Sequence, residues 1–210
     1  MKVLLMGNSS IDESKKYGEV IDDFDLVVRM NRYQIDGFEN YIGSKTNIWV
    51  LNRALSLGKS AIKDYSVPKT FEYNKKFSKD LEYILLVTYI ENSQEYPKLL
   101  DWTKHNSNLR VADTFKISNY LRSRWDELIE KSFYKPATGI LLIHYFLEGY
   151  DKIYLHNFDC GNTKHYWDDS ENDLAQPMLS KHNWSFDEIL ISELVESKKL
   201  CYLGDMIDGE

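Results

Sequence analysis

The sequence predicts an α/β fold, in which a Rossmann-like, mostly parallel sheet is flanked by helices. Short apolar runs alternate along the chain with longer segments of helical periodicity. The run at residues 81–90 carries apolar and aromatic residues at both odd and even positions, as a strand buried on both faces does. Because no repeat or linker interrupts this pattern, we expect a single domain over residues 1–210.

The first strand is expected at residues 3–6, an apolar run that ends at Gly7. A second apolar run covers residues 24–31, and the polar segment between the two runs indicates a helix. A third strand is expected at residues 46–52, and a fourth at residues 81–90. Sheets of this kind bind ligands at the carboxyl ends of their strands.

Helical periodicity marks two segments in the second half of the chain. Residues 119–133 predict an amphipathic surface helix, because one helical face gathers the apolar side chains Leu121, Trp125, Leu128 and Ile129. Residues 138–150 predict a more buried helix that stops at Gly149.

A further strand and a final helix follow. The strand is expected at residues 152–158. The helix is expected to begin near Ser185, because Ser185 and Glu188 have the spacing of a capping box.

Composition and charge exclude some classes of protein. The formal net charge is −7 and the pI is near 5.3, whereas proteins that bind nucleic acid present a dense basic surface to phosphate. Two cysteines, Cys160 and Cys201, are too few for a disulfide scaffold and indicate a reducing compartment. The apolar N-terminal run is too short for a membrane span or a signal peptide. We therefore expect a cytoplasmic protein without a transmembrane segment, for which a peripheral membrane contact stays open.

The end of the first strand is a candidate phosphate or nucleotide site. Asn8, Ser9 and Ser10 follow Gly7, and their side chains, with the amides of a starting helix, suit an anion. One glycine matches neither the dinucleotide fingerprint nor the phosphate loop, so helix capping is the favoured alternative.

Arg29 and Asn31 end the second strand, at the edge where an open α/β sheet binds ligands. An NAD-dependent enzyme or a methyltransferase would instead carry a glycine-rich turn after the first strand and an acidic residue at the end of the second strand.

Metal binding is disfavoured. Asp23 and Asp25 resemble the aspartate pair that holds a divalent ion in many sugar-nucleotide enzymes, but they stand at the entry of their strand, remote from the expected site. His165 and His182 lie 17 residues apart with no third ligand near them in sequence, so zinc is not expected either. From spacing alone, catalytic and purely structural roles stay open for both histidines.

Four segments carry a family resemblance. The first lies between residues 4 and 50 and contains LLMGNSS, VVRMN, GFE and GSKT. The second, at residues 134–159, is YKPATGILLIHYFLEGYDKIYLHNFD, and the last two are GNTKHYWDD and HNWSFD. In this order they resemble the large, small, third and very small sialyl motifs of the family-29 sialyltransferases, and agreement in four motifs is more specific than any one match.

The resemblance implies a variant of the single-domain glycosyltransferase A-type fold and a metal-independent, inverting transfer of sialic acid from CMP-sialic acid to a sugar hydroxyl. The partners are a nucleotide-sugar donor and a glycan acceptor, and no cofactor is needed. The positions that bind CMP in the family fall on Asn8, Ser9, Asn31, Thr138 and Gly139.

The family's two catalytic histidines fall on His165 and His182. His165 corresponds to the histidine that contacts the donor phosphate, and His182 to the general base. CMP carries one phosphate and is a good leaving group, so Asp168 and Asp169 are discounted as metal ligands.

The chain departs from the family pattern at several positions. The very small motif ends in Asp187 instead of glutamate, with Glu188 next to it, and the small motif has Ala137 where serine or threonine is frequent and Asn157 near a usual glycine. The first-strand cysteine and the membrane anchor of animal members are missing from this sequence.

Two other functions stay open. The donor sugar could be another keto-sugar acid such as Kdo, or the chain could be a nucleotide-binding module without catalysis, which the two histidines disfavour. The acceptor would be read by residues 52–133, whose aromatic residues Tyr65, Tyr73, Tyr89 and Trp102 suit sugar stacking as well as a core.

Overall fold

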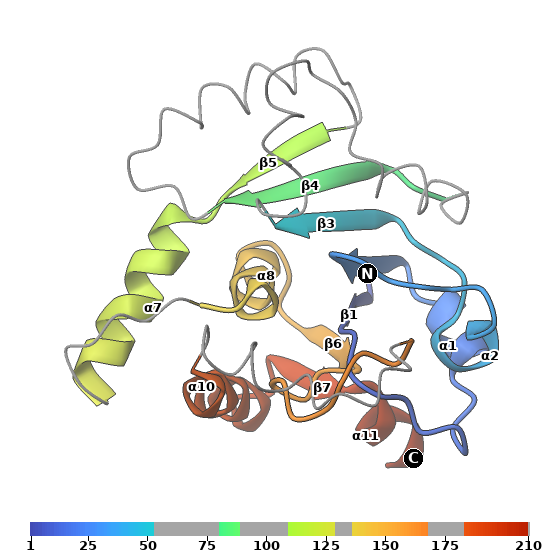
Figure 1. Ribbon diagram of the computed structural model, residues 1–210. Helices are drawn as coiled ribbons and strands as arrows, with labels where there is room; N and C mark the ends of the chain where they lie inside the picture. The colour runs from blue at the N-terminus through green and yellow to red at the C-terminus, as the bar shows by residue number, and fades with distance from the viewer. Residues whose placement is uncertain (53–79, 89–108, 129–135, 168–182, 210) are drawn as a thin grey trace.

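The computed structural model describes residues 1–52, 80–88, 109–128, 136–167 and 183–209. The strands are β1 (Val3–Met6), β2 (Leu26–Met30), β3 (Ile48–Asn52), β4 (Tyr83–Thr88), β5 (Leu109–Asp113), β6 (Ile153–His156) and β7 (Leu200–Tyr202). They form one sheet in the order β5-β4-β3-β2-β1-β6-β7, and each neighbouring pair is parallel (Figure 1). The predicted parallel α/β sheet is confirmed.

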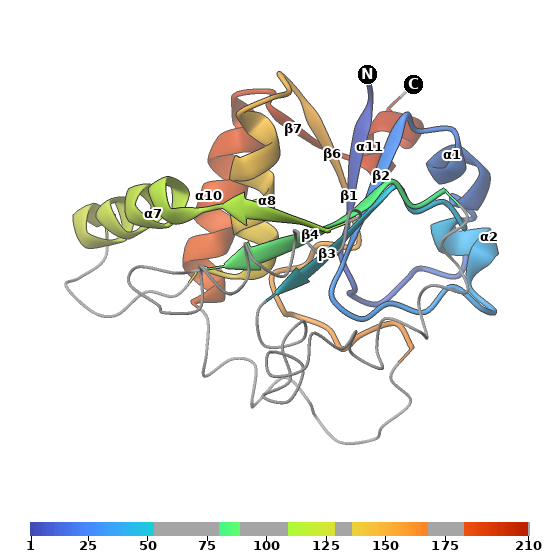
Figure 2. The ribbon, with the colours of Figure 1, turned by 90° about the horizontal axis from the view of Figure 1, so that it is seen from above.

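Helices cover both faces of the sheet. They are α1 (Gly18–Asp22), α2 (Glu39–Ile42), α7 (Phe115–Leu128), α8 (Thr138–Leu147), α10 (Trp184–Glu196) and α11 (Leu203–Asp208). Figures 1 and 2 show α8 and α10 on one face, with α7 beside them, and α1, α2 and α11 on the other.

Strand β1 contributes side chains to the hydrophobic core on both faces of the sheet. Val3 and Leu5 belong to the core cluster shared with α8 and α10, whereas Leu4 and Met6 belong to the cluster shared with α1 and α11. All four side chains are at most 2% exposed. A strand that is apolar on both parities is therefore buried between two helical layers, as its sequence predicts.

Two local predictions differ from the structure. Only the five residues of α1 are helical in the segment between β1 and β2. The last helix begins at Trp184 and its N-cap is Asn183, whose Oδ1 accepts a hydrogen bond from the amide of Phe186 at 3.0 Å. The predicted Ser185–Glu188 capping box is therefore wrong, because the asparagine two residues earlier already caps the helix.

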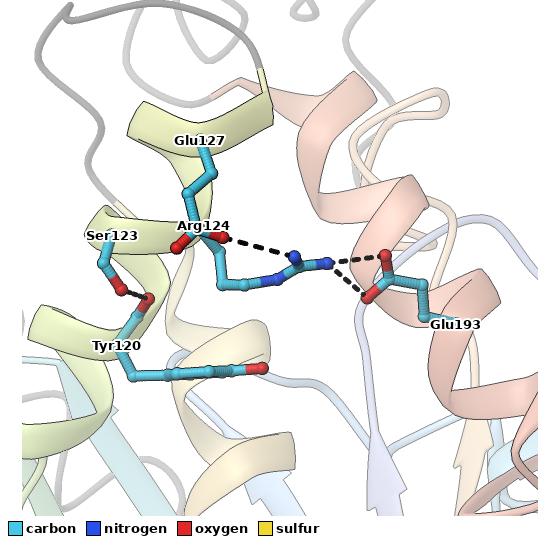
Figure 3. Close-up of polar contacts among 5 residues, drawn as sticks. All are labelled: Tyr120, Ser123, Arg124, Glu127 and Glu193. Carbon is cyan, nitrogen blue, oxygen red and sulfur yellow. Dashed lines mark hydrogen bonds and ion pairs between the residues drawn. The ribbon is translucent and has the colours of Figure 1, made fainter.

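The amphipathic helix α7 begins earlier than predicted, at Phe115, and its Leu121 and Trp125 are buried. It is tied to α10 by Arg124, whose Nη2 lies 2.8 and 3.1 Å from the two carboxylate oxygens of Glu193 (Figure 3). This charge-assisted contact joins two helices on the same face of the sheet.

Among the described residues, no helix combines the length and the apolar character that a membrane span requires.

Candidate active site

The loops after β1 and β6 touch at Gly7. The Gly7 amide donates to the His156 carbonyl at 2.8 Å. A Cβ atom on Gly7 would lie 1.9 Å from the carbonyl oxygen of Asn157, which is closer than any allowed contact distance between the two atoms. The glycine is therefore required because two backbones approach closely, and this approach begins the first turn, which we define as residues 7–10.

Asn8 joins three segments at the carboxyl edge of the sheet. Its side-chain Nδ2 donates to the carbonyls of Met30 and Arg32, at 3.1 and 3.0 Å, and so fixes the first turn to the end of β2. Its own carbonyl oxygen accepts from the Tyr166 amide at 3.2 Å and lies 3.2 Å from Nδ1 of His165. The structure thus brings His165 to a residue that the family resemblance assigns to CMP.

The expected amides of a starting helix are not free in the first turn. The Ser9 amide donates to the Asn157 carbonyl at 3.2 Å, and the Ser10 amide to Oγ1 of Thr163 at 2.9 Å. No helix begins before Gly18. The expected helix-start amides and the alternative, helix capping, are therefore both wrong here, because no helix starts at this turn and the Ser9 and Ser10 amides hold the loop after β6.

Asn31 follows β2 in a left-handed backbone conformation, with φ 55°. Its amide donates to the Val50 carbonyl at 2.6 Å, and its carbonyl accepts from Nε1 of Trp49 at 2.7 Å. Asparagine tolerates this conformation better than other residues with a side chain, which accounts for its place at the strand end.

Thr138 and Gly139 open α8, and Thr138 is buried. The N-cap residue Ala137 has no side-chain cap. Cβ atoms built on Gly139 and Gly7 would lie 2.8 and 3.0 Å from the ring of Phe158. The ring therefore packs between the start of α8 and the first turn, a contact with no signal in the sequence because it depends on two glycines 132 residues apart.

His165, Tyr166 and Trp167 are consecutive aromatic residues whose rings pack together. The His165 ring stacks on Trp167, with centroids 4.8 Å apart and planes inclined by 20°. Next to it, the Tyr166 hydroxyl donates to the Gln34 carbonyl at 2.6 Å and accepts from the Gln34 amide at 3.1 Å. These contacts limit how far the imidazole can turn away from Asn8.

His182 lies outside the described residues, as do Asp168, Asp169 and the aromatic residues proposed to bind the acceptor. The helix that follows His182 is described, because α10 begins at Trp184. In its first turn Asp187 is fully buried. Glu188 is not a cap and instead accepts a hydrogen bond from Nδ2 of Asn162 at 3.1 Å.

Arg29 has a structural role. Its buried guanidinium donates to the carbonyls of Ile42, Gly43 and Lys45 and to the hydroxyl of Thr46, which fixes the loop between α2 and β3. Burial lowers its pKa below the usual range. Burial, with a smaller effect of this cation, also lowers the pKa of His156 to about 4, so this histidine is neutral at physiological pH.

Of the two aspartates at the entry of β2, Asp25 has a structural partner. Asp25 accepts a hydrogen bond from the Lys2 amide at 2.6 Å. In the described part of the chain, no three histidine, cysteine, aspartate or glutamate side chains are grouped as metal ligands would be.

Residues 3–199 match the model of glycosyltransferase family 29 (sialyltransferase). CMP-N-acetylneuraminate-beta-galactosamide-alpha-2,3-sialyltransferase 1 of Sus scrofa is 26% identical, over 93% of this chain and 56% of the relative. Sialyltransferase 4 of the same description from Mus musculus is also 26% identical, over 96% of this chain and 64% of the relative. The chain spans little more than half the length of such curated relatives.

Solved structures share the fold. A mammalian sialyltransferase in complex with Gal-beta-1-3GalNAc-ortho-nitrophenol aligns with a TM-score of 0.60 at 21% identity, over 96% of this chain and 68% of that one. The sialyltransferase CstII from Campylobacter jejuni, in complex with the substrate analogue CMP-3FNeuAc, aligns with a TM-score of 0.61 at 17% identity, over 98% and 82%.

Proposed function

Because this chain belongs to glycosyltransferase family 29, the sialyltransferases, we propose that it transfers sialic acid from CMP-sialic acid to a sugar hydroxyl of a glycan. The proposal includes inversion at the anomeric carbon and independence from metal ions. It assigns donor binding to Asn8, Ser9, Asn31, Thr138 and Gly139.

The observation that carries the proposal is the contact between His165 and Asn8. The resemblance assigns His165 to the donor phosphate and Asn8 to CMP, two positions 157 residues apart in sequence. Their contact at the carboxyl edge of the sheet supports a common role at the donor. Phe158 supports the same site, because it packs against both the first turn and the start of α8.

The reaction needs a base and a group that stabilises the leaving phosphate. The acceptor oxygen attacks the anomeric carbon as the bond from that carbon to the CMP phosphate oxygen breaks. His182 takes the proton of the hydroxyl as general base.

His165 acts on the other side of the bond that breaks. The departing phosphate gains negative charge in the transition state, and a hydrogen bond donated there stabilises the transition state more than the bound donor. The anchoring of His165 by Trp167 and Asn8 supports this role, because a donor that is already in position costs no reorganisation during the reaction.

The names of the relatives suggest the acceptor to test first. Several act on a beta-galactosamide with alpha-2,3 linkage, so a galactose-terminated glycan is our first candidate. CMP-Kdo is the alternative donor. We also propose a cytoplasmic location. In the described part of the chain, both cysteines are free thiols.

The experiment is calorimetric titration of the purified protein with CMP, with UMP, UDP and NAD as controls and EDTA present throughout. We expect selective binding of CMP. Transfer assays with CMP-sialic acid and CMP-Kdo on a galactose-terminated acceptor then identify the sugar. A folded protein that does not bind CMP would rule out the enzyme, and CMP binding without transfer from either donor would favour the module without catalysis.

A further inference from the structure

Asn157 occupies a position that suits glycine. It follows β6 directly and has φ 55°, in the left-handed region. The small sialyl motif usually has a glycine near this point. Asparagine tolerates the conformation, so the backbone explains why Asn157 is allowed here. It does not explain what the side chain contributes.

The backbone of Asn157 lies at the centre of the proposed donor site. Its carbonyl oxygen accepts from the Ser9 amide at 3.2 Å and is the atom that excludes a side chain at Gly7. The next residue, Phe158, packs against Gly139 at the start of α8. Asn157 therefore connects the two segments to which donor binding is assigned.

The side-chain amide of Asn157 is buried without an acceptor. Within the described residues, its Nδ2 atom has no hydrogen-bond partner. Asn8, the same residue type on the adjoining turn, makes two hydrogen bonds through its Nδ2. An unsatisfied buried amide costs free energy, on the order of 1–3 kcal/mol. Such an atom needs an explanation, and at a proposed binding site an acceptor supplied by the bound ligand is one.

We propose that Asn157 donates a hydrogen bond from Nδ2 to a phosphate oxygen of the nucleotide donor. This rests on the proposed function and adds a donor-binding residue to it. The phosphate is the acceptor that the surroundings favour, because the Asn157 carbonyl holds the first turn and the same turn holds His165, the residue assigned to the phosphate. An amide donor binds an anionic oxygen more strongly than a neutral one.

The test compares CMP with cytidine, which lacks the phosphate. Both are titrated by calorimetry into the wild type and Asn157→Gly, with EDTA present. Glycine keeps the left-handed backbone and removes the whole side chain, including the amide. We expect the affinity for CMP to fall about tenfold, as the loss of one charge-assisted hydrogen bond predicts, and the affinity for cytidine to stay unchanged.

Two further variants separate the amide from the backbone. Lys198 is also left-handed, with φ 60°, and lies exposed between α10 and β7. Lys198→Gly therefore makes the same backbone change away from the site and should leave CMP binding unchanged. Asn157→Asp keeps the shape but places a carboxylate against the phosphate, so it should weaken CMP binding more than Asn157→Gly does.

Each result decides a separate point. Equal CMP affinity in the wild type and a folded Asn157→Gly overturns the proposal. Equal losses for CMP and cytidine overturn the assignment to the phosphate. A folded wild type that binds neither compound overturns the proposed function itself, and this inference with it.

Discussion

Nδ1 of His165 lies 3.2 Å from the backbone carbonyl oxygen of Asn8. A carbonyl oxygen only accepts hydrogen bonds, so Nδ1 carries the hydrogen in this contact. In a neutral ring Nε2 would then be an acceptor, and it can donate to a phosphate only when the ring is protonated on both nitrogens.

Replacing His165 should impair the chemical step. We expect His165→Ala to lower kcat about 100- to 1,000-fold, the usual effect of losing one donor to a developing anion. Initial rates at saturating substrate measure kcat. His144→Gln, on the buried helix α8, is the control, and a variant kcat near that of the wild type would remove His165 from the mechanism.

Replacing His182 should separate binding from transfer. His182→Ala should abolish transfer, because the acceptor hydroxyl loses its base. Its affinity for CMP should match that of the wild type. Calorimetry and a transfer assay on the same preparation measure the two quantities. Full transfer by this variant is incompatible with the proposed base.

Chelation should leave transfer unchanged. CMP carries a single phosphate, and the proposed mechanism places His165 at the position where a metal would neutralise charge. Rates with EDTA and with added Mg²⁺ or Mn²⁺ should therefore agree. A strict requirement for a divalent ion would direct attention back to the aspartates, including Asp168 and Asp169.

Gly7 should not tolerate a side chain. In Gly7→Ala the new Cβ would meet the Asn157 carbonyl, and the backbones of two loops must move apart. We expect a loss of stability of about 1–3 kcal/mol or more, together with weaker CMP binding. Gly149→Ala is the matched control, since its nearest atom is 4.0 Å away. Chemical denaturation compares the two, and equal stabilities would show that the loops adapt freely.

Stability should fall in mild acid because of two buried histidines. Burial lowers the pKa of His144 and of His156 from 6.5 to about 4. Between these values the unfolded chain binds protons that the folded chain does not, so stability is full above pH 6.5 and decreases as the pH falls towards 4. The loss is about 3 kcal/mol for each histidine.

Denaturation curves from pH 7.5 to 4.5 measure this loss. His144→Gln removes one of the two groups without touching the proposed site, so its curves should depend less on pH than those of the wild type. If the two proteins lose equal stability over this range, His144 does not titrate as its burial implies.

The apolar runs of the sequence predicted the central strands well. Strands buried on both faces leave a continuous apolar signal, as β1 and β4 do. Strand β5 (Leu109–Asp113) was not predicted, because Arg110 and Asp113 leave it neither a continuous apolar run nor a regular alternation, and β7 (Leu200–Tyr202) has only three residues. Local periodicity gives little evidence for elements as short or as mixed as these.

The site could be predicted only in part. The sialyl motifs assigned His165 and Asn8, and the structure places them in contact. The prediction of free helix-start amides was wrong, because the Ser9 amide donates a hydrogen bond to the carbonyl of Asn157, a residue 148 positions later. The packing of Phe158 could not be predicted, because its ring lies against two glycines, Gly7 and Gly139, from segments far apart in the sequence. Contacts between loops depend on how the strands are ordered, which local sequence does not specify.

The position of β1 between β2 and β6 imposes an order on folding. Val3 pairs with Leu26 on one side and with Ile153 on the other. The second pairing closes a loop of about 150 residues and is entropically expensive until other parts of the sheet are in place. During synthesis, the Gly7 turn emerges 149 residues before its partner His156. The proposed donor site therefore forms only after this long segment has been made, and a nascent chain would carry its first motif long before it could bind the donor.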